Sequence, residues 1–83
     1  MSREIKRKMK KFENNIASNI RYYRKLLNLT QEQLASFLNG KKSLVSNYEN
    51  GHSTPDIYTL VQLADLFKIS LDEFVGRNID LLK

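Results

Sequence analysis

Residues 29–51 constrain the fold of this chain more than any other segment, because they carry start and stop signals for two short helices. Thr30 can cap the first helix, and Gln33 three residues later completes a capping box. Asn39 and Gly40 end that helix, since both residue types tolerate a positive φ and allow a sharp reversal. The chain is therefore expected to form two short helices joined by a tight turn.

The second helix of this pair is expected over about residues 41–50, with Gly51 suited to a left-handed cap. Val45 and Tyr48 lie three residues apart and are expected to face the core. The opposite face carries polar side chains that can reach phosphates and base edges, namely Lys42, Ser43, Ser46 and Asn47. The pattern alone is also compatible with other small helical proteins, because two amphipathic helices with a glycine turn are common.

Residue identities narrow the choice, because several separate stretches occur in order: TQEQLA at 30–35, VSNYENG at 45–51, Pro55, LVQLADLF at 60–67 and ISLDEF at 69–74. Together they resemble the Cro/repressor-type helix-turn-helix family, the XRE-like regulators, over about residues 15–76. The resemblance implies an all-α, compact five-helix lambda-repressor-like DNA-binding domain. Its second and third helices would form the helix-turn-helix.

The resemblance also implies roles for individual side chains. Positions that read bases in this family correspond here to Lys42, Ser43 and Asn47. Positions that touch the DNA backbone in this family correspond to Gln31 and Asn50. Ser46 could meet sugar or phosphate, and Lys41, where the chain departs from the family pattern, could add a phosphate contact. The chemistry suits these roles, because lysine can donate to guanine O6 and N7 and asparagine can pair bidentately with adenine.

The turn departs from the family pattern, which places Gly, an apolar residue and a Ser or Thr cap where this chain has Asn39, Gly40 and Lys41. The second helix therefore lacks a clear cap, and its first turn is expected to be weakly held. Leu44 occupies a position that is often small and polar in the family. It could pack on a thymine methyl group or shield the edge of the core.

Glycine, proline and capping signals predict three more helices. The first covers at least residues 15–27, with an apolar stripe of Ile16, Ile20, Tyr23 and Leu27. The fourth begins near Pro55 and is expected to bury Ile57, Leu60, Val61, Ala64 and Phe67. The fifth is capped by Ser70 and is expected to bury Leu71, Phe74 and Val75.

We expect three segments along the chain: a basic and helical N-terminal extension over residues 1–13, the helix-turn-helix domain over residues 14–76, and a short C-terminal tail over residues 77–83. Ile5, Met9 and Phe12 continue the apolar spacing of the first helix, which is therefore expected to reach back toward Ser2. The extension could pack on the tail residues Ile79, Leu81 and Leu82, on a second subunit, or along DNA as a basic arm.

The net charge is +5, and its distribution matters more than its sum. Lysine and arginine outnumber acidic residues through residue 52, whereas acidic residues are in excess from residue 53 onward. A basic half that contains the predicted helix-turn-helix suits phosphate binding. A solvated charged face is the alternative.

Composition argues against several other classes of protein. Eighty-three residues suit one domain with one modest core. The chain has no cysteine, no apolar run of about 20 residues and no hydrophobic signal core, so we expect a cytoplasmic protein without disulfides or a membrane span. The single histidine, His52, has no nucleophile or metal ligand at a suggestive spacing, and we expect no catalytic residue, cofactor or metal.

These observations lead to the expectation of a sequence-specific double-stranded DNA-binding protein, a transcriptional repressor that binds a palindromic operator as a homodimer. Two alternatives remain open. One is an antitoxin or protein-interaction module with autoregulatory DNA binding, whose extension or tail grips a protein partner. The other is a nonspecific nucleic-acid binder that relies on the basic extension.

Overall fold

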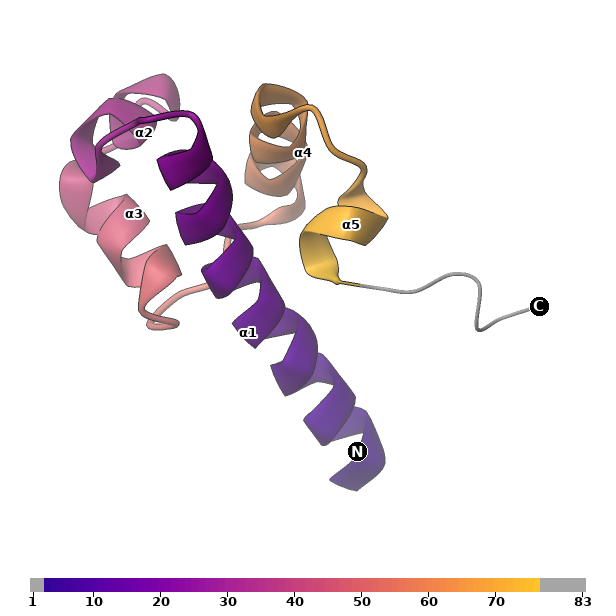
Figure 1. Cartoon of the computed structure of the whole chain (residues 1–83). Helices are drawn as coiled ribbons and strands as arrows, with labels where there is room; N and C mark the ends of the chain where they lie inside the picture. The colour runs from indigo at the N-terminus through magenta and orange to yellow at the C-terminus, as the bar shows by residue number, and fades with distance from the viewer. Residues whose placement is uncertain (1–2, 77–83) are drawn as a thin grey trace.

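Five helices form the part of the chain that the computed structural model describes, which is the backbone of residues 3–76 and the side chains of residues 15–76. They are α1 (Arg3–Leu26), α2 (Gln31–Phe37), α3 (Lys42–Glu49), α4 (Ile57–Phe67) and α5 (Leu71–Val75). These described residues contain no strand, which confirms the predicted all-α fold. The C-terminal part of α1 lies among the other helices, whereas its N-terminal part projects beyond them (Figure 1).

The first helix runs without interruption from Arg3 to Leu26, as the continuous apolar spacing predicted. At 1.5 Å per residue, such a helix is about 36 Å long. Two described side chains of α1 bond to the end of α5, and the first is Asn15, whose Nδ2 donates to the carbonyl oxygen of Val75 at 3.3 Å. Asn19 Nδ2 donates to the carbonyl oxygen of Phe74 at 2.6 Å. The predicted cap at Ser2 and the predicted packing of residues 77–83 lie outside the described residues.

The core is built from one apolar face of each helix. Its completely buried members are Ile20, Leu34, Val45, Leu63 and Phe74. Tyr23 stacks on Phe67, with ring centroids 5.4 Å apart, and Phe67 lies against Phe74 with centroids 5.8 Å apart. This aromatic row joins α1, α4 and α5 and helps to fix the orientation of these three helices relative to one another.

Three helices begin at residues whose side chains cap them, and the sequence predicts two of these caps, Thr30 and Ser70. Thr30 and Gln33 form the reciprocal capping box of α2, with Gln33 N donating to Thr30 Oγ1 at 3.0 Å and Thr30 N donating to Gln33 Oε1 at 2.8 Å. Asp56 caps α4, and Ser70 caps α5. Among these described helix starts, α3 has no side-chain cap, because Lys41 occupies that position, as predicted.

Four residues expected in the core are exposed instead: Leu27, Ile57, Val61 and Leu71. Leu27 follows the last residue of α1, where the chain turns toward Asn28 at a φ of 58°, so its side chain leaves the apolar stripe of the helix. In α4 the core is filled by Leu63, Ala64 and Phe67, which leaves the face bearing Ile57 and Val61 outside.

The turn between α2 and α3 uses its two small residues differently from the prediction. Asn39 adopts the expected positive φ, of 56°, but Gly40 is not in the left-handed region. Gly40 instead provides space, because a Cβ atom there would lie 2.6 Å from Leu44 Cδ2. Leu44 is half-buried and packs against the core, in agreement with one of the two roles considered for it, shielding of the core edge.

Candidate nucleic-acid interface

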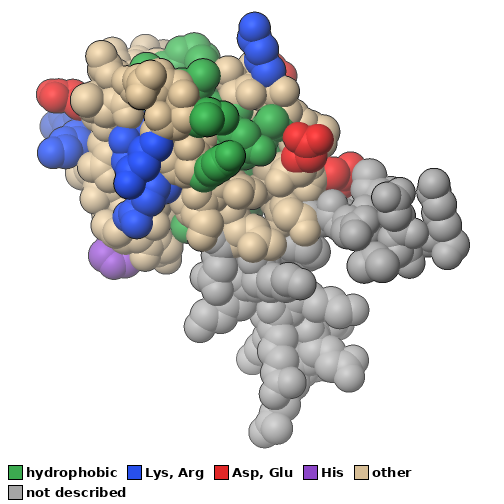
Figure 2. Space-filling view, viewed as in Figure 1, with side chains coloured by type: hydrophobic (Ala, Val, Ile, Leu, Met, Phe, Trp, Pro, Cys, Tyr) green, Lys and Arg blue, Asp and Glu red, His purple; other side chains and the backbone are tan. Residues whose placement is uncertain are grey.

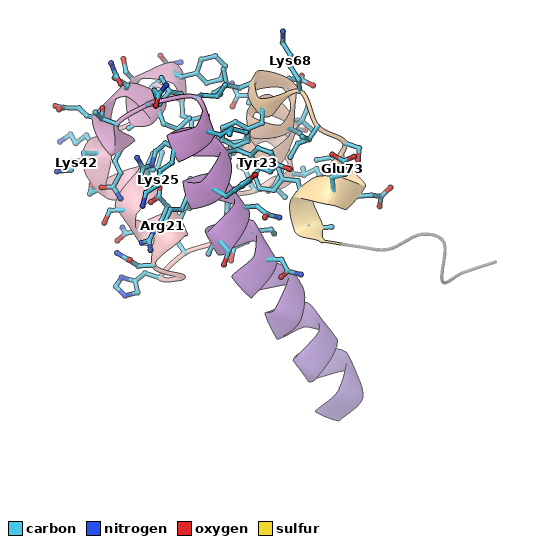
Figure 3. The ribbon with its side chains drawn as sticks, viewed as in Figure 1. Arg21, Tyr23, Lys25, Lys42, Lys68 and Glu73 are labelled. Atoms are coloured by element: carbon cyan, nitrogen blue, oxygen red, sulfur yellow. The ribbon has the colours of Figure 1, made fainter. Side chains whose placement is uncertain are left out.

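The second and third helices pack against each other and present one face of α3 to solvent. Val45 and Tyr48 are buried, as predicted, and fix the inner face of α3. The expected base-reading residues Lys42, Ser43 and Asn47 are all exposed. Figure 3 shows Lys42 on the same side of the molecule as two basic side chains of α1, Arg21 and Lys25. The structure thus brings polar and basic groups from α1 and α3 to one side.

The residues expected to touch the DNA backbone lie around this face. Lys41 is exposed at the start of α3, and Asn50 is exposed at its end. Ser46 is half-buried and accepts a hydrogen bond from Asn50 Nδ2 at 3.3 Å. Gln31 is half-buried at the start of α2, and its Nε2 donates to Glu49 Oε1 at 3.3 Å. Two of these four side chains, those of Lys41 and Asn50, are therefore exposed at the two ends of α3, and the other two are half-buried.

Glu49 occupies the centre of a network that the sequence analysis did not identify. Its side chain is 0% exposed at the last residue of α3. Arg24 Nε donates to Glu49 Oε2 at 2.6 Å, and Arg24 Nη2 donates to Glu49 Oε1 at 3.1 Å. Arg24 Nη1 also donates to the carbonyl oxygen of Leu29 at 2.8 Å. The network consequently ties α3 to α1 and to the segment leading into α2.

The electrostatic consequence is a buried but ionised pair. Burial acts to raise the pKa of Glu49, but the hydrogen bonds from Arg24 and Gln31 outweigh it and hold this pKa below the ordinary glutamate value. The hydrogen bond to Glu49 raises the pKa of Arg24, against the opposing effect of its own burial. Both groups are therefore charged at neutral pH, and each satisfies the other.

A signal for this network was present in the sequence. Glu49 lies four residues after Val45 and directly after Tyr48, which places a carboxylate on the core face of α3. Arg24 lies four residues after Ile20, on the edge of the core face of α1. A charged residue on a buried helical face needs an opposite charge, so the two could have been paired.

Other kinds of site receive no support from the described residues. His52 is exposed in the loop after α3. Within residues 15–76, whose side chains are described, no three His, Cys, Asp or Glu side chains come together as a metal site would require. Within residues 3–76, no helix combines the length and apolar character needed to cross a membrane.

The comparisons with known proteins point to the same segment. The profile of the helix-turn-helix family matches residues 20–74, which run from the C-terminal part of α1 through α2, α3 and α4 into α5. The chain belongs to the helix-turn-helix family. This match confirms the resemblance to the XRE-like regulators that the stretches at 30–35 and 45–51 indicated.

Curated relatives of this helix-turn-helix chain are regulators by name. The cryptic phage CTXphi transcriptional repressor RstR of Vibrio cholerae serotype O1 is 39% identical over 54 residues, or 65% of this chain and 48% of that protein. The HTH-type transcriptional regulators AnsR and ImmR of Bacillus subtilis are 39% and 37% identical over 55 and 49 residues, or 66% and 59% of this chain.

The matches cover 48%, 47% and 39% of RstR, AnsR and ImmR, so they span less than half the length of each of these curated relatives. No solved structure gives a significant match to the helix-turn-helix chain.

Proposed function

We propose that this helix-turn-helix protein is a sequence-specific double-stranded DNA-binding transcriptional repressor, which reads a palindromic operator through the major groove. The observation that carries the proposal is the two-sided construction of α3. Val45, Tyr48 and Glu49 are buried on one side, and Lys42, Ser43 and Asn47 are exposed on the other. A helix held rigidly in this way can present donors and acceptors to base edges. The printed names of the relatives support a role in transcriptional regulation.

Within this proposal, some polar residues contact base edges and others contact the DNA backbone. Lys42, Ser43 and Asn47 read bases, because they are exposed along the outer face of α3. The residues that fix register through the DNA backbone are Gln31, Lys41, Ser46 and Asn50. The charge pattern agrees with this division, since the basic half of the chain contains α1, α2 and α3. Figure 2 shows Lys and Arg side chains gathered over these helices.

A palindromic operator calls for two copies of the domain, and we assign the second copy to the outer face of α4. This face exposes three large apolar side chains, with Ile57 at 58%, Tyr58 at 79% and Val61 at 41% exposure. They lie within one turn of one another on the helix. Acidic residues are in excess in this half of the chain, so the face suits a protein surface better than a phosphate backbone. We also propose a cytoplasmic location, because the named relatives are transcriptional regulators of bacteria, whose DNA lies in the cytoplasm.

Selection of bound sites from random double-stranded DNA at fixed salt tests the proposal. We expect an enriched palindrome whose half-sites lie about one helical turn, ~34 Å, apart. The protein should bind that site roughly 10³-fold or more tightly than random DNA at physiological salt. Equal affinity for both would contradict sequence-specific binding and favour the nonspecific alternative.

A substitution then tests the role of the outer face of α3. Asn47→Ala should weaken discrimination at one base pair by about 1–3 kcal/mol, because its amide would no longer bond a base edge. Glu73→Gln, at an exposed position of α5 away from α3 (Figure 3), is the control and should leave discrimination unchanged. An unaltered ratio of operator to random affinity in Asn47→Ala would exclude base reading by that residue.

A further inference from the structure

The network around Glu49 carries more positive charge than the carboxylate needs. Arg24 provides two donors to Glu49, and its side chain is only 12% exposed. This largely buried guanidinium group therefore already neutralises the buried carboxylate. Arg21 is a second cation on the same carboxylate, and its side chain is 49% exposed. One carboxylate with two guanidinium groups leaves a net charge of one unit, and that charge lies on the exposed member.

We infer that Arg21, with Gln31 and Asn50, forms a binding site for a DNA backbone phosphate, with Arg21 as a contact that the family resemblance did not supply. The inference rests on the proposed DNA-binding function and deepens it. The three side chains come from α1, from the start of α2 and from the end of α3. A single phosphate at this point would therefore be held by all three helices of the candidate interface.

Hydrogen bonds bring these three side chains together. Arg21 Nε and Gln31 Nε2 each lie 3.3 Å from the same atom, Glu49 Oε1. Arg21 Nη2 lies 3.5 Å from Asn50 Oδ1, and Asn50 Nδ2 donates to Ser46 Oγ. The two residues expected to contact the backbone, Gln31 and Asn50, are thus joined through Arg21.

The lengths of these bonds indicate which of them can be exchanged. The bond from Arg24 to Glu49 Oε2 is 2.6 Å, whereas the bonds from Arg21 are 3.3 and 3.5 Å and lie at or beyond the upper end of the usual range. Arg21 can therefore turn toward a phosphate while Arg24 continues to donate two hydrogen bonds to Glu49, at 2.6 and 3.1 Å. The guanidinium fork suits this purpose, because it binds phosphate oxygens bidentately.

The position of Arg21 agrees with the proposed docking face. Figure 3 shows Arg21 and Lys25 on the side of α1 that faces α3, with Lys42 beyond them. A duplex whose major groove receives α3 would pass its flanking backbone close to this side. Lys68, in contrast, lies at the far end of α4 and points away from this side of the molecule.

The salt dependence of DNA binding by Arg21→Gln tests the inference. One lost phosphate contact lowers the slope of log affinity against log salt by about 0.9. We expect that decrease, with an equal factor of affinity lost on the selected operator and on random DNA, because a phosphate carries no sequence information. Arg21→Lys keeps the charge and should restore most of the slope. Lys68→Gln removes the same charge elsewhere and should leave the slope at the wild-type value.

A purely structural role for Arg21 would give a different result. In that case Arg21→Gln would lower the urea midpoint of unfolding, while the fully folded protein would keep the wild-type salt slope. That result, or a slope in Lys68→Gln reduced as much as in Arg21→Gln, would overturn the inference. Failure of the proposed function would give another result, because the wild-type protein itself would then bind the operator and random DNA with equal affinity. The change in slope on random DNA would still decide the role of Arg21.

Discussion

Arg24 and Glu49 form a buried ion pair, with Arg24 Nε 2.6 Å from Glu49 Oε2, between the first helix and the last residue of the third. The carboxylate is 0% exposed and accepts hydrogen bonds from both guanidinium groups nearby and from the amide of Gln31. The pair thereby fixes the end of α3 against α1. Since α3 lacks a side-chain cap at its other end, this contact is the main polar restraint on its orientation among the described residues.

Removing one partner of the Arg24–Glu49 ion pair should lower the free energy of unfolding. Glu49→Gln leaves the Arg24 guanidinium largely buried without its carboxylate, and the loss of one partner of a buried pair typically costs about 3–5 kcal/mol. We expect the free energy of unfolding in urea at pH 7 to fall by that amount. Asp65→Asn changes an exposed acidic residue of α4 and is the control, with an expected change within about 0.5 kcal/mol. Equal stabilities of the two variants would contradict the structural role of the pair.

The same pair predicts a loss of stability in acid. The pKa of Glu49 is lower in the folded protein than its ordinary value of 4.5, so the unfolded chain binds the proton at a higher pH than the folded protein does. The stabilisation is therefore complete above the unfolded pKa and is lost as the pH falls through the folded pKa. Urea unfolding from pH 7 to pH 2.5 should show the wild-type midpoint falling steeply below about pH 4.5.

Glu49→Gln provides the comparison for that pH series. It should lose less stability over the same range, so the difference between the two proteins should shrink in acid. A smaller acid dependence should persist in the variant, because hydrogen bonds from Thr59 lower the pKa of Asp56 as well. A difference that stays constant from pH 7 to pH 2.5 would show that the titration of Glu49 does not contribute.

The helices could be predicted from the sequence because their signals are local. Thr30, Asp56 and Ser70 act on amides three residues away, and Asn39 takes its positive φ within a single turn. The exposure of Ile57 and Val61 could not be predicted in this way. Helical periodicity shows that α4 is apolar on several sides, but the packing of α1 and α5 decides which side is covered.

The candidate site was only partly predictable for the same reason. The exposed face of α3 follows from the spacing of Val45 and Tyr48 within one helix. The network of Glu49 depends on residues 18 to 28 positions away, on two other helices. Charge counting assigned Arg21 and Arg24 equally to the basic half of the chain, whereas the fold buries one beside the carboxylate and leaves the other half-exposed.

The capping box at the start of α2 should contribute measurably to stability. Thr30→Ala removes the hydrogen bond from Gln33 N to Thr30 Oγ1, and the loss of such a cap costs about 1 kcal/mol. For a domain of this size we expect the melting temperature to fall by about 4–8 °C. Thr54→Ala, in the exposed loop before α4, is the matched control and should leave the melting temperature nearly unchanged. A fall of the same size in both variants would argue against a specific contribution of the cap.

The apolar face of α4 should control self-association if it receives a second copy. Val61→Glu places two like charges near each other across a symmetric interface, and we expect the mass in sedimentation equilibrium to shift from dimer toward monomer. Ser36→Glu adds the same charge to an exposed position of α2 and should retain the wild-type mass. A wild-type mass in Val61→Glu would place the interface between copies elsewhere on the protein.

Two glycines with nearly equal φ values allow the cost of a left-handed backbone to be separated from the cost of a steric contact. Gly51 and Gly76 have φ values of 75° and 74°, so an alanine at either position adopts the unfavourable left-handed region, at a cost of about 1–2 kcal/mol. A Cβ at Gly51 meets no described atom within 4 Å, whereas one at Gly76 would lie 2.5 Å from Asn15 Nδ2 and 2.9 Å from its Cγ. Gly76→Ala should therefore lower the free energy of unfolding more than Gly51→Ala, because the Asn15 side chain must also release its bond to Val75. In an Asn15→Ala background the extra loss at Gly76 should largely disappear, and the double-mutant cycle measures that coupling. Equal losses at the two glycines in the wild-type background would mean that the Asn15 side chain moves away from the new Cβ with no measurable loss in the free energy of unfolding.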